Sequence, residues 1–141
     1  MDVKKETRYW LILSAVCMIF VALMRGMGGV LLLLKQSDLD TGTKITASQT
    51  GILLVGAGLI IIALMFIISA IGVLRLRYFF WKLGIVTTIL FIIEGAVNGL
   101  VLYGRPLEAG TLINISAAAV ILLLLFMGRN AVQAYKSMLL K

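Results

Sequence analysis

The sequence predicts an all-α integral membrane protein, a four-transmembrane-helix bundle with both termini in the cytoplasm and a short amphipathic C-terminal helix. Hydrophobic residues make up 62% of the 141 residues and charged residues 13%, which is far from the averages of soluble domains. The apolar residues form four stretches separated by short polar segments. Each stretch reaches the roughly 20 helical residues that a bilayer requires.

The four expected spans cover about residues 9–34, 47–74, 83–103 and 111–128 of a single membrane domain. We expect helices because lipid requires backbone polar groups to be satisfied internally, and no stretch shows the period-2 alternation of a barrel. The basic start of the chain resembles that of a signal peptide. The first apolar run is long, however, and has no convincing small-residue cleavage site at its end, so we expect a retained helix.

Positive charge sets the expected orientation, because cytoplasmic flanks retain Lys and Arg. Nine of these residues lie on the side of the two termini and the middle loop, and only three lie on the other side, where acidic residues balance them. We therefore expect both termini in the cytoplasm and a location in the cell (inner or plasma) membrane. The nine are Lys4, Lys5, Arg8, Arg75, Arg77, Lys82, Arg129, Lys136 and Lys141; opposite are Lys35, Lys44 and Arg105, with Asp38, Asp40 and Glu108.

Two cytoplasmic segments are expected to lie at the membrane surface. Residues 75–82 interleave aromatic and basic side chains, as at the level of lipid headgroups. Residues 129–141 place apolar side chains at helical spacing opposite polar ones, which is typical of an interfacial helix. The expected partners are anionic headgroups. The net charge of +7 does not indicate nucleic acid, because the cations flank the spans.

The remaining connections are short, and the composition removes much common chemistry. Residues 35–46 form a polar linker, and 104–110 a tight turn suited to Pro106. Histidine is absent and Cys17 is alone in the sequence, so His-ligated haem, the usual zinc sites and an intramolecular disulfide lack their ligands. We expect no metal, no cofactor and no catalytic residue.

Two charged residues, Arg25 and Glu94, fall inside the expected spans, where insertion costs roughly 2.5–3.5 kcal/mol each. Both lie nine residues before the outer end of their span, or about 14 Å deep at 1.5 Å per residue. Asn98 shares the helix face of Glu94, Asn114 falls at a similar or shallower depth, and Gln49 opens the second span from the same side. These five residues are the expected ligand-binding site. Glycines around them permit close helix packing: Gly26, Gly28, Gly29, Gly95 and Gly99.

Two interpretations of this polar cluster stay open. The charges can neutralise each other while the asparagines join helices, or they can line a pocket, open to the extracytoplasmic side, for a small polar or anionic ligand anchored by Arg25. A neutralised ion pair suits an accessory subunit of a larger membrane complex. A ligand pocket suits a binding or transport protein, for which a homo-oligomer is one expected form. A quinone-linked or other membrane enzyme using Glu94 ranks last, because histidine and a second intramembrane carboxylate are missing.

The general plan of four short-looped helices, with a charged residue in the first and a basic middle loop, resembles that of DoxX-like small membrane proteins. The resemblance lies in architecture over most of the chain, and no residue role is carried over from it.

Overall fold

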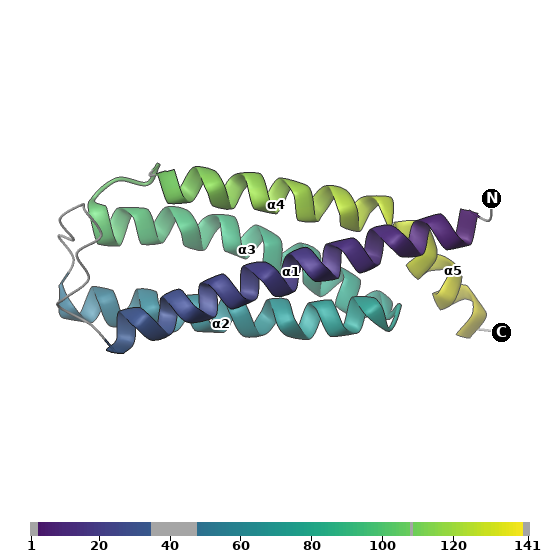
Figure 1. The fold of residues 1–141 in the computed structure, drawn as a ribbon, viewed down its shortest axis with the longest axis horizontal. Helices are drawn as coiled ribbons and strands as arrows, with labels where there is room; N and C mark the ends of the chain where they lie inside the picture. Colours follow the sequence, from purple (N-terminus) through teal and green to yellow (C-terminus); the bar gives the residue numbers. More distant parts are fainter. Residues whose placement is uncertain (1–2, 35–47, 108, 140–141) are drawn as a thin grey trace.

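The computed structural model describes residues 3–34, 48–107 and 109–139, and within these ranges the fold is all-helical (Figure 1). The helices are α1 (Val3–Leu34), α2 (Gln49–Leu74), α3 (Tyr78–Tyr103), α4 (Ala109–Met127) and α5 (Arg129–Leu139). The predictions for the linker 35–46, for residue 47 and for Lys35, Lys44, Asp38, Asp40, Glu108 and Lys141 lie outside the described residues, as do those for the side chains of Lys4 and Lys5.

Four of these helices are long and apolar enough to cross a membrane: Arg8–Leu34, Gln49–Leu74, Tyr78–Tyr103 and Ala109–Met127. The prediction of an all-helical chain with four long apolar helices is therefore confirmed. Large apolar side chains also cover the outer faces of the helices, among them Phe20, Leu54, Leu64 and Phe126. Such helices, apolar around most of their circumference, differ from the amphipathic helices of a soluble bundle.

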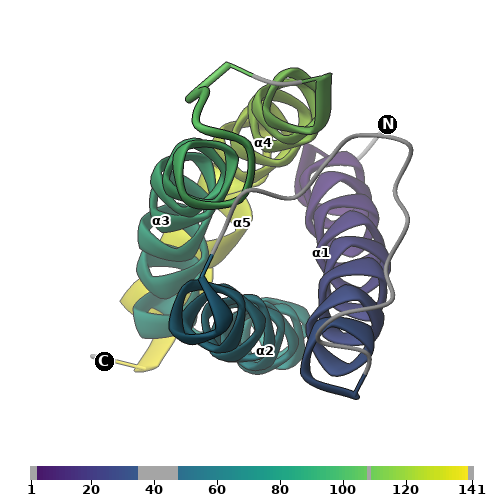
Figure 2. The same ribbon diagram turned by 90° about the vertical axis from the view of Figure 1, so that its left-hand side faces the viewer.

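The four long helices stand in a ring. Each packs against the next in the sequence and α4 closes against α1, so that α1 lies diagonally across from α3 (Figure 2). Helix α1 crosses the bundle obliquely, and α5 turns across the end that also carries the N-terminus (Figure 1). The turn between α3 and α4 lies at the opposite end, beside the end of α1 and the start of α2.

The apolar core is divided along the bundle axis. A large cluster fills the half nearer α5, where Phe66 and Phe91 meet edge to face with ring centroids 5.4 Å apart. A smaller cluster around Ile52, Val55 and Leu102 lies toward the α3–α4 turn. Along α1 and α3, Arg25 and Glu94 lie between these two clusters.

Glycines hold the outer part of α1 against α2. A Cβ atom on Gly29 would lie 2.8 Å from the carbonyl oxygen of Gly56 and 2.8 Å from Cγ1 of Ile60. A Cβ atom on Gly56 would in turn lie 3.0 Å from the side chain of Leu33. The two backbones therefore touch, as small residues allow in membrane helices, and this contact fixes where α1 presents Arg25.

Helix α3 begins at Tyr78, before the expected start at residue 83. The reason is the turn that ends α2: the amide of Arg77 donates to the carbonyl of Gly72 and that of Leu76 to Val73, which is the hydrogen-bond pair of a Schellman motif. Leu76 adopts the left-handed conformation, with φ 56°. The chain thus reverses within a few residues, and α3 takes in most of the basic and aromatic segment.

The aromatic residues of that segment have different roles. Trp81 is buried and donates from Nε1 to the carbonyl of Leu125 at 2.9 Å, so it packs inside the bundle. Tyr78 stacks on Trp81, and the ammonium groups of Lys82 and Lys136 lie 5.0 and 4.6 Å from the Tyr78 ring centroid. Helix α5 is therefore attached to α3 through Lys136 and Tyr78, and it also packs against α1 and α4.

Candidate functional site

Arg25 on α1 and Glu94 on α3 face each other inside the bundle. Nη2 of Arg25 lies 3.5 Å from Oε2 of Glu94, and the two side chains are 16% and 12% exposed. Asn98, one helical turn after Glu94, donates from Nδ2 to the other carboxylate oxygen. The Arg25 guanidinium also lies over the Phe91 ring, 4.7 Å from its centroid, a cation–π contact that favours the charge in this apolar surrounding.

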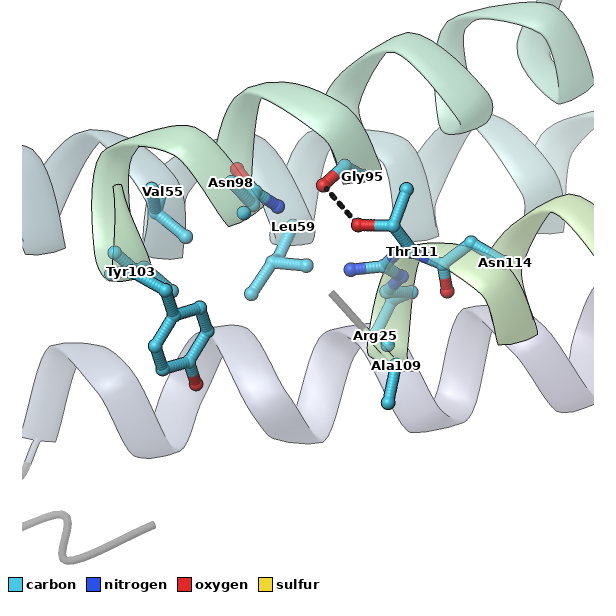
Figure 3. Close-up of a pocket in the computed structure, with 12 residues that line it drawn as sticks. Arg25, Val55, Leu59, Gly95, Asn98, Tyr103, Ala109, Thr111 and Asn114 are labelled. Carbon is cyan, nitrogen blue, oxygen red and sulfur yellow. Dashed lines mark hydrogen bonds between the residues drawn. The ribbon is translucent and has the colours of Figure 1, made fainter. Parts of the chain in front are cut away.

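Beside this ion pair lies a pocket of about 390 Å³ to which all four long helices contribute (Figure 3). Its size suits a small molecule. Residues of the α3–α4 turn region form one end of it, so the pocket lies in the half of the bundle away from α5. The lining residues are Arg25, Val55, Leu59, Gly95, Asn98, Gly99, Leu102, Tyr103, Ala109, Gly110, Thr111 and Asn114.

Two glycines of α3 allow α4 to form the wall of the pocket. Thr111 donates from Oγ1 to the carbonyl of Gly95 at 3.2 Å, as drawn in Figure 3. A Cβ atom on Gly95 would lie 2.6 Å from Nδ2 of Asn114, and one on Gly99 would lie 2.7 Å from the carbonyl oxygen of Arg105. Gly95 and Gly99, which were expected to permit close helix packing, therefore let α4 and the α3–α4 turn of the same chain approach the backbone of α3.

The charged atoms that face each other are not otherwise satisfied. Nη2 of Arg25 and Oε2 of Glu94 are buried and have no hydrogen-bond partner among the described residues. They attract as opposite charges at 3.5 Å, but without hydrogen-bond geometry. A guanidinium carries five N–H donors in a fixed fork, so Arg25 retains donor capacity next to the pocket that it lines.

The structure brings together most of the residues that the sequence singled out. Arg25, Asn98 and Asn114 line the pocket, and Glu94 lies behind its wall, holding Arg25 and Asn98. Gln49 is the first residue of α2, is exposed, and is not among the described residues that line the pocket.

Sequence reasoning missed Tyr103 and Thr111, which also line the pocket. Both stand at the ends of expected spans, where a polar group carries no unusual cost, so nothing in the sequence distinguishes them from ordinary boundary residues. Their place beside the α3–α4 turn is visible only once the two helices are packed.

The polar groups that line the pocket include both donors and acceptors of hydrogen bonds, and the charged group among the described lining residues is the Arg25 guanidinium. These polar groups comprise a guanidinium, two carboxamides and two hydroxyls, on walls of Val, Leu and Gly. No group of three or more His, Cys, Asp or Glu that could hold a metal ion occurs among the described residues. The arrangement is suited to holding the oxygen atoms of an anion or a polar molecule.

No protein-family model, no curated protein and no solved structure matches this chain.

Proposed function

We propose that this chain is a multi-pass protein of the cell membrane that binds, or transports, a small polar or anionic ligand in the pocket beside Arg25. Both termini and α5 would lie in the cytoplasm, and the pocket would face the extracytoplasmic side. The distribution of charge supports this orientation. Among the described side chains, cations gather at the α5 end of the bundle, including Arg75, Arg77 and Arg129, while Arg105 is near the pocket.

The observation that carries the ligand proposal is a buried cation with unused donors on the wall of a cavity. Nη2 of Arg25 forms an ion pair with Glu94 but has no hydrogen-bond partner among the described residues. Arg25 lines the pocket of about 390 Å³ together with Asn98 and Asn114. In a surrounding of low dielectric constant, a charge of this kind attracts an anion far more strongly than it would in water. An ion pair that served packing alone would not need the adjoining space or the further amides.

The other half of the bundle supports binding from one side. Phe66, Met18 and Leu125 are completely buried in the large apolar cluster below the pocket. The buried polar side chains described in that half carry hydroxyl groups and no charge: Ser14, Ser69, Thr87 and Thr88. Transport would require helices to move, or a second copy of the chain to complete a path. We therefore place binding first and transport second.

The test is a ligand-dependent rise in thermal stability of the purified protein in detergent. We expect at least one compound in a panel of small mono- and dicarboxylates to raise the melting temperature of the wild type. Arg25→Ala should abolish this rise, while Arg105→Ala, a matched change of an exposed arginine, should preserve it. A panel without a single stabilising compound would contradict the proposal.

A second pair of variants leaves Arg25 in place, in case its loss prevents folding. Gly95→Ala would push on the Asn114 amide, which can rotate away, so the fold should survive while the site changes shape. Gly58→Ala adds a methyl group where no atom lies within 4 Å, at a position of α2 that is not among the residues lining the pocket. The stabilisation by the same compound should therefore fall in Gly95→Ala and remain in Gly58→Ala.

The direct contact of Arg25 with Glu94 favours one alternative, an accessory subunit in which the polar cluster only fixes helix packing. That role predicts that the chain co-purifies with other subunits and that no carboxylate stabilises it. An enzymatic role has less support, because Glu94 contacts Arg25 and Asn98 and is not among the described residues lining the pocket.

A further inference from the structure

A second, smaller groove lies on the outer surface at the turn between α2 and α3. Its volume is about 200 Å³, and its lining combines two arginine residues with apolar ones. The groove is at the α2–α3 turn and the pocket beside Arg25 is next to the α3–α4 turn. These two turns lie at opposite ends of the bundle, the former nearer α5 (Figure 1). The lining residues of the groove are Ile68, Ile71, Gly72, Arg75, Arg77 and Phe80.

The turn fixes the backbone from which both arginines project. Arg75 caps α2, and the amide of Arg77 closes the Schellman motif on the carbonyl of Gly72. The intervening Leu76 has φ 56°, a conformation that costs a branched or bulky residue free energy. Its side chain packs against the large core cluster, and this packing offsets the cost. Arg75 and Arg77 remain exposed on either side of that anchor.

The floor of the groove is closely packed. A Cβ atom on Gly72 would lie 2.0 Å from Cγ of Phe80, so the phenylalanine ring lies directly on the α2 backbone. The absence of a side chain at residue 72 therefore allows α3 to form one wall of the groove.

Neither arginine has a negatively charged partner among the described residues. No carboxylate of those residues lies within ion-pair distance of Arg75 or Arg77. The sequence itself has no Asp or Glu between residues 41 and 93, and none after Glu108. Two like charges thus lie at one groove without a carboxylate partner among the described side chains, an arrangement that favours binding of an anion.

An apolar track leads away from this groove along α2. Ile61, Leu64, Ile68 and Ile71 are all about half exposed, and their spacing of three and four residues places them on one helix face that ends at Arg75. From Ile61 to Ile71 the track is about 15 Å long at 1.5 Å per residue. That is about half of a 30 Å hydrocarbon core, the depth of a single leaflet.

We propose that this groove binds an anionic phospholipid of the cytoplasmic leaflet, with its phosphate between Arg75 and Arg77 and an acyl chain along the α2 track. The inference rests on the membrane insertion proposed above, and it does not depend on any ligand of the Arg25 pocket. The combination of charge and track distinguishes a lipid from a soluble phosphate, which would use the arginines and leave the apolar wall uncovered.

The experiment is native mass spectrometry of the detergent-solubilised protein with dioleoylphosphatidylglycerol and, separately, dioleoylphosphatidylcholine. The wild type should prefer the anionic lipid. Removing both charges in the double variant Arg75→Gln with Arg77→Gln should reduce that preference about 30-fold, at about 1 kcal/mol for each cation. Lys82→Gln with Arg129→Gln removes the same charge at the same end, outside the groove, and should change the preference less than about threefold.

Three further measurements complete the test. Arg75→Lys with Arg77→Lys should keep the preference, because a lysine binds phosphate as a point charge. Ile71→Ser should weaken binding of both lipids without changing their ratio. Soluble glycerol phosphate should fail to displace the lipid. Equal losses in the two charge-removing double variants, or displacement by glycerol phosphate, would overturn the proposal.

Membrane insertion is tested separately from lipid preference. Resistance of the wild type to extraction by alkaline carbonate would support membrane insertion. In that case the absence of a lipid preference would contradict the lipid site alone, and not the proposal that the protein spans the membrane. Extraction of the wild type into the soluble fraction would instead contradict insertion itself, and with it the lipid site.

Discussion

Arg25 and Glu94 connect two helices that stand diagonally across the bundle, with Nη2 and Oε2 3.5 Å apart. The backbones of α1 and α3 do not pack on each other directly, so this pair spans the interior. It also separates the large apolar cluster near α5 from the small cluster near the α3–α4 turn. The charges therefore lie where the bundle changes from a filled core to one with a pocket.

Removal of one member of this pair should destabilise the protein strongly. Arg25→Ala leaves Glu94 buried without its counter-charge, which costs about 3–5 kcal/mol for a buried pair. Arg105→Ala, at an exposed position, should change the free energy of unfolding by less than about 0.5 kcal/mol. The measurement is unfolding in mixed micelles of a mild detergent and dodecyl sulfate.

The charge exchange gives the control for this prediction. Arg25→Glu combined with Glu94→Arg should recover more than half of the lost free energy, because Asn98 can turn its carboxamide to accept from a guanidinium. Equal stability of the wild type and Arg25→Ala would show that the pair does not hold the helices together.

A second prediction concerns the seam between α1 and α2. Gly29→Ala places a methyl group 2.8 Å from the Gly56 carbonyl oxygen, and because backbone cannot easily move aside, we expect a loss of about 1–3 kcal/mol. Gly28→Ala meets no atom within 4 Å and should be neutral or stabilising by up to about 1 kcal/mol, from helix propensity. The same unfolding assay measures both. Similar effects of the two variants would argue against the close contact.

The sequence was informative where a physical constraint acts along the chain itself. Apolar length predicted four long helices, which the structure confirms. The fixed rise of a helix placed Arg25 and Glu94 at one depth, and the structure brings them within ion-pair distance. Depth says nothing about rotation around a helix axis, however, and Gln49, near the same end, is not on the wall of the pocket.

Other features depend on which faces of the helices meet. The aromatic residues of the basic segment look alike in the sequence, although Trp81 is buried and Phe79 is exposed. Similarly, Gly28 and Gly29 are neighbours in an apolar run, but Gly29 alone of the two contacts another backbone. Such differences arise from tertiary packing, and the periodicity of the sequence does not predict them.

A third prediction tests the orientation and the access to the pocket. In a Cys17→Ser background, Asn114→Cys should react in intact cells with a membrane-impermeant thiol reagent, because Asn114 lines the pocket on its proposed outer side. Thr87→Cys, at a fully buried position in the other half, should not react. Ser137→Cys on α5 should react only after permeabilisation. Labelling of Ser137→Cys in intact cells would contradict the proposed orientation.

The last prediction concerns Trp81, whose indole bond joins α3 to the end of α4. Leu125 lies in the last turn of α4, where carbonyl groups lack a helical donor, and Trp81 supplies one from Nε1 at 2.9 Å. Trp81→Phe keeps the aromatic ring but leaves that buried carbonyl unpaired, which should cost about 1–3 kcal/mol.

The loss should extend to α5, because Trp81 also packs against Phe126 and stacks on Tyr78, the ring beside Lys136. We therefore expect trypsin to cleave after Arg129 and Lys136 faster in Trp81→Phe than in the wild type. Trp10→Phe, at a tryptophan 36% exposed, provides the matched control and should leave the cleavage rate unchanged. Equal cleavage rates in Trp81→Phe and Trp10→Phe would mean that α5 is held by its own contacts, through the buried Val132, and not by the indole.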